Sequence, residues 1–125
     1  MKVLALDYGS ARTGVAVSDP TGTLARPVAT IAQVDKTDGF DELLALVRSE
    51  EPELVVVGLP LTLRGEHGEQ ARATTAFVER LRAALDTRVE LWDERFTSVL
   101  AGGDDARAAA HLLSSYLEWS SAGKE

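Results

Sequence analysis

Two short, uninterrupted apolar runs predict the central strands of a sheet. Residues 3–6 and residues 54–57 are apolar at every position, which is typical of strands that are covered on both faces. Asp7 follows the first run directly, and Gly58 follows the second. The pattern indicates two buried, parallel strands that deliver a carboxylate and a glycine at their C-terminal ends.

A hairpin and an edge strand are predicted between these two runs. Residues 15–17 resume an apolar strand after a short polar turn that carries Arg12, so the economical interpretation is a hairpin. Residues 23–31 predict a third strand. Pro27 lies within it, and because proline lacks an amide hydrogen, it favours an edge position or a bend.

Apolar residues at three- and four-residue spacing predict the first two helices. One is expected to begin after an N-cap at Thr37 or Asp38 and to end before Pro52. The other covers about residues 71–85 and follows a glycine-containing loop with Arg64.

The last helix is predicted to run from Asp104 or Asp105 to Trp119. Either aspartate suits a helix N-terminus, where a carboxylate is favourable. Asp105 is expected on the face that packs on the sheet, because the three-and-four spacing places it on one stripe with Ala108, Leu112 and Tyr116.

The element order predicts an α/β fold with a five-stranded mixed sheet and helices on both faces. Residues 88–92 supply the fifth strand, and right-handed crossovers make the first, fourth and fifth strands parallel. The length of 125 residues suits one domain. We assign residues 1–119 to it and expect residues 120–125 to form a frayed tail.

Acidic residues that are distant in sequence converge at one edge of this predicted sheet. Asp7, Asp93 and Glu94 follow parallel strands, and Asp105 begins the helix that leaves the same edge. Neighbouring residues of a strand point to opposite faces, so at most one of Asp93 and Glu94 faces Asp7. Clustered carboxylates suit hard cations such as Mg²⁺ or Mn²⁺, whereas an isolated Asp7 would be only a turn residue.

Composition narrows the function further. The chain has no cysteine, which excludes disulfides and thiolate metal sites, and its net charge of -7 argues against non-specific coating of nucleic acid. No apolar stretch approaches the ~20 residues of a membrane span, and the N-terminus lacks the basic start of a signal peptide. We therefore expect a cytoplasmic protein without a membrane partner.

Four segments resemble the YqgF family, described as pre-16S ribosomal RNA nucleases and as Holliday-junction-resolvase-like proteins of the ribonuclease H fold. Together, in this order and spacing, the segments are specific, and they extend over nearly the whole chain. They are Leu6-Asp7-Tyr8-Gly9 with Arg12, Gly14, Val15, Ala16 and Ser18-Asp19; Val57-Gly58-Leu59-Pro60 with Gly65, Gly68 and Ala71; Asp93-Glu94-Arg95 with Thr97; and Asp105 with Ala108, Ala109, Leu112, Leu113, Tyr116 and Leu117.

The resemblance implies a metal-dependent endonuclease that hydrolyses phosphodiesters. Its catalytic residues would be Asp7, Glu94 and Asp105, and two Mg²⁺ or Mn²⁺ ions would be held by these three together with Asp93. The predicted substrate-binding residues are Arg12, Arg64 and Arg95. The implied partners are structured RNA, in particular the pre-16S rRNA 5′ end and ribosomal precursor particles, or branched DNA. The sequence leaves the oligomeric state open.

One departure from the family pattern supports an alternative function without catalysis. Family members carry a longer, often lysine-rich segment before the last helix, whereas only residues 99–103 separate Ser98 from Asp104 here. A chain without this segment could be a catalytically inert module that binds nucleic acid or ribosomes. A third hypothesis is a sugar-kinase or actin-like ATPase, suggested by the Asp7 hairpin, but such enzymes close two domains on the nucleotide.

Overall fold

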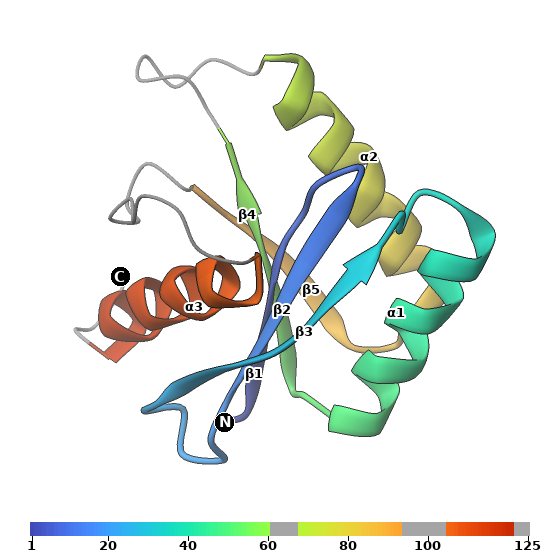
Figure 1. The fold of residues 1–125 in the computed structure, drawn as a ribbon. Helices are drawn as coiled ribbons and strands as arrows, with labels where there is room; N and C mark the ends of the chain where they lie inside the picture. Colours follow the sequence, from blue (N-terminus) through green and yellow to red (C-terminus); the bar gives the residue numbers. More distant parts are fainter. Residues whose placement is uncertain (61–67, 94–104, 122–125) are drawn as a thin grey trace.

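The computed structural model describes residues 1–60, 68–93 and 105–121. These residues form five strands and three helices (Figure 1). In chain order they are β1 (Val3–Asp7), β2 (Arg12–Ser18), β3 (Ala25–Ala32), α1 (Thr37–Glu50), β4 (Leu54–Leu59), α2 (Glu69–Ala84), β5 (Arg88–Asp93) and α3 (Asp105–Ser121).

The strands form one mixed sheet in the order β3-β2-β1-β4-β5. The pairs β1/β2 and β2/β3 are antiparallel, whereas β1/β4 and β4/β5 are parallel. This arrangement confirms the predicted mixed sheet and the edge position of β3. Pro27 lies in that edge strand opposite Ala16, beside a register shift at Val15 and Ala16, where a missing amide costs least.

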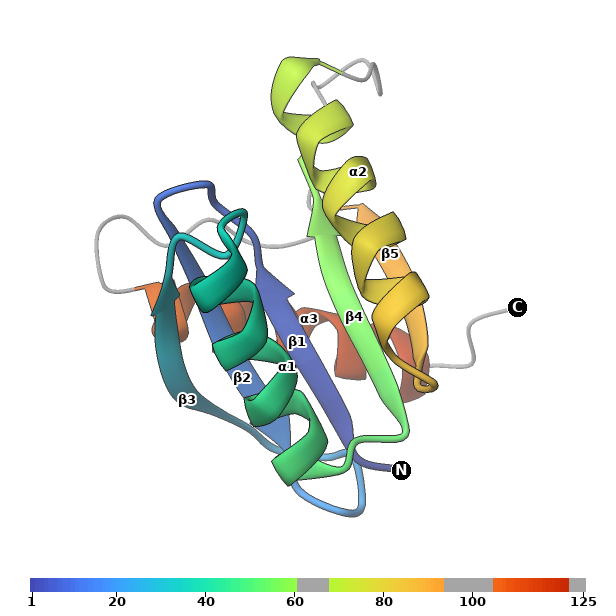
Figure 2. The ribbon, with the colours of Figure 1, turned by 90° about the vertical axis from the view of Figure 1, so that its right-hand side faces the viewer.

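Helices cover both faces of the sheet, as predicted. Figure 2 shows α1 and α2 in front of the sheet and α3 behind it. Each face of the sheet has its own hydrophobic core, and successive side chains of β1 point alternately into one core and the other. Leu4 and Leu6 pack toward α1 and α2, while Val3 and Ala5 pack toward α3. The same alternation sends Asp7 to the α3 side and Tyr8 to the other side.

Helix α1 begins one residue earlier than a cap at Thr37 would require, so the predicted N-cap is wrong. Lys36 is the N-cap, it makes no side-chain capping bond, and its carbonyl accepts the amide of Phe40 at 2.9 Å. Gly39 explains the shift, since a Cβ there would collide with the carbonyl oxygens of Ala32 and Gln33. The first turn is therefore set by close packing on the end of β3.

Helix α3 is longer than predicted, and its buried face includes Ala109 in place of Ala108. Ser120 and Ser121 of the expected tail belong to the helix, and residues 122–125 lie outside the described residues. Ala108 is exposed, so its place on the buried stripe was wrong. The side chains that pack on the sheet are Ala109, Leu112, Leu113, Tyr116 and Leu117.

No helix within the described ranges combines the length and the apolar character that crossing a membrane requires.

Candidate active site

A glycine brings the start of α3 against the hairpin beside Asp7. Gly14 on β2 is the register partner of Asp7 on β1. A Cβ at Gly14 would overlap the carbonyl oxygen of Asp105 and would lie 3.0 Å from the amide nitrogen of Ala106. Because only glycine allows this approach, the first residue of α3 sits next to the strand pair that carries Asp7. The predicted convergence of Asp7 and Asp105 therefore has a backbone cause.

The environment of Asp7 disfavours its ionised form. Burial is the main cause that raises the pKa of this carboxyl above its ordinary 3.8, and the negative charge of Asp105 raises it further. No hydrogen bond or ion pair among the described residues involves the Asp7 side chain. Two neighbouring carboxylates thus create a local excess of negative charge that a cation would relieve.

The positive charge of Arg12 already compensates part of this negative charge. Its Nε lies 2.9 Å from Oδ2 of Asp105, with 69% of the arginine side chain and 36% of the aspartate side chain exposed. Arg12 is the first residue of β2, just after the turn in which it was predicted. An exposed pair of this kind contributes about 0–1 kcal/mol, so the guanidinium can leave Asp105 at little cost.

The turn between β1 and β2 is braced by Thr13. This buried residue receives a hydrogen bond from the Gly9 amide at 3.4 Å and donates one to the Gly9 carbonyl at 3.2 Å. A Cβ at Gly9 would lie 2.5 Å from the carbonyl oxygen of Arg12, which requires glycine at this position. The turn therefore holds Arg12 in a fixed place relative to Asp7.

Behind the turn, Tyr8 is locked into the core. Its ring stacks on Phe77 with the centroids 4.4 Å apart, and its hydroxyl donates to the Asp35 carboxylate at 2.7 and 2.8 Å. Burial and this bond raise the pKa of Tyr8 to about 12. Sequence reasoning missed Asp35, because its loop carries no periodic pattern that would direct it to Tyr8.

The other predicted site residues lie on another strand or outside the described residues. Asp93 is the last residue of β5, and β4 separates that strand from β1. Glu94, Arg64, Arg95 and Asp104 lie outside the described residues. Within residues 1–60, 68–93 and 105–121, no three His, Cys, Asp or Glu side chains gather closely enough to hold a metal ion.

The carboxylates that are present nevertheless fit a hard divalent cation. Both offer oxygen atoms, the donors that Mg²⁺ and Mn²⁺ prefer. Burial, and to a lesser degree the charge of Asp105, raise the pKa of Asp7, so a cation bound by the two carboxylates would favour their ionised forms. A third ligand from the segment after β5 would complete a set of three.

The chain is similar to known proteins of one family. A family model described as "RuvX: Holliday junction resolvase" matches residues 1–104, which end directly before α3. A protein of Rubrobacter xylanophilus is 44% identical over 94% of this chain and 92% of its own length, and one of Roseiflexus sp. is 44% identical over 80% of this chain and 71% of its own. Both are named "Putative pre-16S rRNA nuclease".

The fold is that of RuvC. The structure titled "T. thermophilus RuvC in complex with Holliday junction substrate" superimposes with a TM-score of 0.67 over 99% of this chain and 97% of that chain, at 12% identity. This likeness confirms the predicted ribonuclease H-like fold. The family model and the relatives confirm the predicted resemblance, and the chain belongs to the RuvX, or YqgF, family of resolvase-like nucleases.

Proposed function

We propose that this protein is a divalent-metal-dependent endonuclease that hydrolyses a phosphodiester in precursor 16S rRNA, in the cytoplasm. The single observation that carries the proposal is the pairing of a half-buried Asp7, whose pKa is raised, with Asp105 at the C-terminal edge of a ribonuclease H-like sheet. Carboxylates held together against their mutual repulsion indicate a site built for a cation. The names of the relatives supply the substrate.

Asp7 and Asp105 would hold the metal, together with Glu94 as the third ligand and with Asp93 as the alternative to Glu94. A bound divalent ion, or a pair of them, would supply a water nucleophile at neutral pH and stabilise charge on the phosphate oxygens. Gly14 and Thr13 would position the metal-binding residues. Gly14 allows α3 to approach β2, and Thr13 fixes the turn between β1 and β2.

Arg12 would act on the substrate phosphate. In the structure it neutralises Asp105, and a cation that binds the carboxylates would take over that role. The released guanidinium then lies beside the site with its donors available for a phosphate, which it can bind in a bidentate manner. Arg64 and Arg95 are proposed to add further phosphate contacts.

Two findings favour other substrates or no reaction. The family description and the RuvC likeness point to four-way DNA junctions as the second candidate substrate. The alignment with the Rubrobacter relative extends over 132 residues, more than the 125 of this chain, so that relative has residues without a counterpart here. A missing substrate-contacting segment would leave an inert binding module.

The test is a cleavage assay on a pre-16S rRNA 5′-end transcript and on a four-way DNA junction, each with Mg²⁺, Mn²⁺ or chelator. We expect metal-dependent cleavage of the RNA and its loss in Asp105→Asn. Cleavage of the junction alone would reassign the substrate. No cleavage of either, together with RNA binding that is equal in chelator, would establish the inert module.

A further inference from the structure

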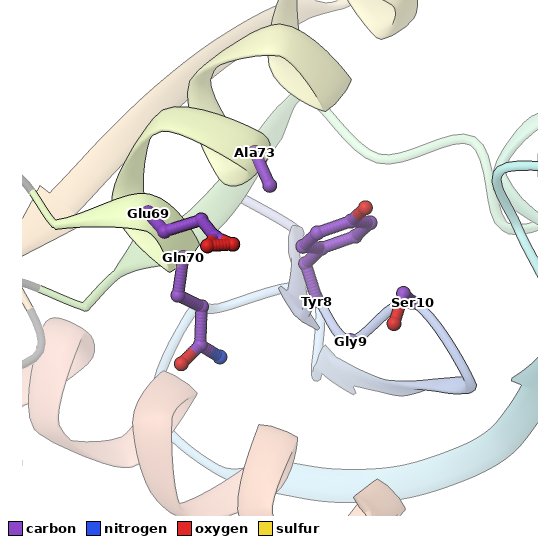
Figure 3. Close-up of a pocket in the computed structure, with 6 residues that line it drawn as sticks. All are labelled: Tyr8, Gly9, Ser10, Glu69, Gln70 and Ala73. Atoms are coloured by element: carbon purple, nitrogen blue, oxygen red, sulfur yellow. The ribbon is translucent and has the colours of Figure 1, made fainter.

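A pocket of about 350 Å³ is lined by Tyr8, the residue that follows Asp7 in the chain. It lies on the face of β1 opposite to the Asp7 side chain. Its lining comes from the turn after β1 and from the first two turns of α2 (Figure 3). In Figure 3 Glu69 and Ala73 lie across the opening from Tyr8, and the Gln70 side chain extends from α2 toward the lower part of the view. The nuclease mechanism proposed above uses none of the three α2 residues.

The chemistry of the lining selects an uncharged, planar group. Tyr8 and Ala73 provide apolar surface, the Gln70 amide can both donate and accept, and Ser10 adds a hydroxyl. Glu69 is an acceptor of N–H groups and repels anions. None of the six described lining residues is a cation and Glu69 is an anion, so these residues favour a heteroaromatic ring with N–H donors over a phosphate.

The wall of this pocket is preformed. The Tyr8 ring is fixed by Phe77 and by the hydrogen bonds to Asp35, and the Asp35 carboxylate also lies 3.9 Å from Arg80. Tyr8 is 8% exposed, and because its ring is already fixed, the part that faces the pocket can contact a ligand without a further loss of side-chain entropy. The volume is at the lower end of those of small-molecule sites, which suits one nucleobase.

We propose that this pocket holds a single unpaired nucleobase of the RNA strand whose phosphodiester is cleaved at Asp7. Asp7 and Tyr8 are adjacent residues at the C-terminal end of β1, so a nucleotide whose phosphate lies at Asp7 is placed with its base passing over this strand end into the pocket. A base inside a duplex has its hydrogen-bonding edge occupied, whereas an unpaired base can be splayed out and read. The proposal rests on the nuclease function and adds a preference for single-stranded RNA at the cut.

The test measures binding of an RNA hairpin with a single-stranded overhang, compared with the same hairpin carrying abasic nucleotides in the overhang. Calcium replaces magnesium, and a gel confirms that the RNA stays intact. We expect the wild type to bind the base-containing RNA about tenfold more tightly, the scale of one stacked base. Ala73→Leu fills the pocket and should bring the ratio close to one.

Ala76→Leu is the matched control, because Ala76 is an exposed alanine of the same helix outside the pocket. It should keep the wild-type ratio. Gln70→Leu keeps the side-chain size, removes the amide and should lower the ratio by a smaller factor. An unchanged ratio in both Ala73→Leu and Gln70→Leu, or equal wild-type binding of both hairpins, overturns the pocket proposal and leaves metal-dependent cleavage standing. If the protein binds the base-containing RNA more tightly but never cleaves RNA, the pocket proposal is supported and only the proposed nuclease function is overturned.

Discussion

Asp7 and Asp19 occupy similar places in the sequence and opposite physical states in the structure. Each follows an apolar strand segment, Asp7 at the end of β1 and Asp19 directly after β2. The Asp19 carboxylate accepts hydrogen bonds from the Thr21 hydroxyl and from the amides of Thr23 and Leu24, the latter two at 2.7 and 2.9 Å, and these bonds lower its pKa to about 2. The pKa of Asp7 moves the other way, raised by burial and by Asp105.

The difference is the one expected between a carboxylate that stabilises its own turn and one that binds a metal ion. The charge of Asp19 is satisfied by its own turn, so its ionisation favours the fold. The charge of Asp7 is opposed by its surroundings, so the fold bears a cost that a bound cation would remove. The four predictions that follow test this contrast, beginning with the largest effect.

Asp7→Asn should reduce cleavage by about a hundredfold or more, because several kcal/mol of charge stabilisation at the phosphate depend on the metal site. Thermal stability in chelator should be equal or higher. The ionised wild-type side chain lowers the stability of the fold only above pH 3.8, the ordinary pKa of the carboxyl. The stability gain of Asp7→Asn should therefore be absent below pH 3.8 and should grow as the pH rises through the raised pKa of the folded protein. A large loss of stability would make Asp7 structural.

Gly14→Ala should destabilise the protein by about 1–3 kcal/mol, because the added methyl group collides with the Asp105 backbone. Cleavage should fall in the remaining folded protein, since α3 must move away from β2. Urea denaturation and the cleavage assay measure the two effects. Gly68→Ser is the control, because nothing lies within 4 Å of a Cβ at Gly68. Equal stability of Gly14→Ala and wild type would disprove the close approach.

Arg12→Ala should tighten Mn²⁺ binding by about two- to fivefold, the range of an exposed ion pair, because the cation no longer displaces the guanidinium from Asp105. RNA binding should weaken, and its dependence on salt should fall by about one phosphate contact. Calorimetry and anisotropy measure these changes. The exposed Arg26 of β3 gives the control variant Arg26→Ala. Weaker Mn²⁺ binding in Arg12→Ala would mean that Arg12 supports the ion and does not compete with it.

Asp19→Asn should lower the melting temperature slightly at neutral pH and leave Mn²⁺ affinity unchanged. Because the folded-state pKa is depressed, the stability from Asp19 is present above pH 3.8 and is lost as the pH falls through about 2. The melting-temperature difference between Asp19→Asn and wild type should therefore shrink in acid. A change in Mn²⁺ affinity would contradict the assignment of Asp19 to structure alone.

Patterns that repeat along the chain were sufficient to predict the fold. The apolar runs of β1 and β4, the position of Pro27 and the helical spacing led to the observed sheet and layers. Features that depend on one backbone approaching another were not predictable. The close approach of Gly14 to α3 and the side-chain bond from Tyr8 to Asp35 join residues that are distant in sequence. The packing of Gly39 in the first turn of α1 against Ala32 and Gln33 is more local, but like the other two it follows no period.

The candidate site, like the fold, was predicted only in part. Topology alone placed Asp7 and Asp105 at one edge, because parallel strands share a C-terminal side. It did not indicate that Arg12 would pair with Asp105, since both side chains had separate roles in the prediction. The choices between Asp93 and Glu94 and between Asp104 and Asp105 stay predictions, as Glu94 and Asp104 lie outside the described residues.

The packing of α3 also sets an order of events during synthesis. This helix, the last element of the chain, contacts β1, β2 and β3, which are the first to be made. Asp105 cannot meet Asp7 before the intervening strands and helices have left the ribosome, and this long-range contact is slow to form. A nascent chain therefore carries only half of the carboxylate pair on which the proposed metal site depends, and that site can form only after α3 has been made and has packed against the sheet.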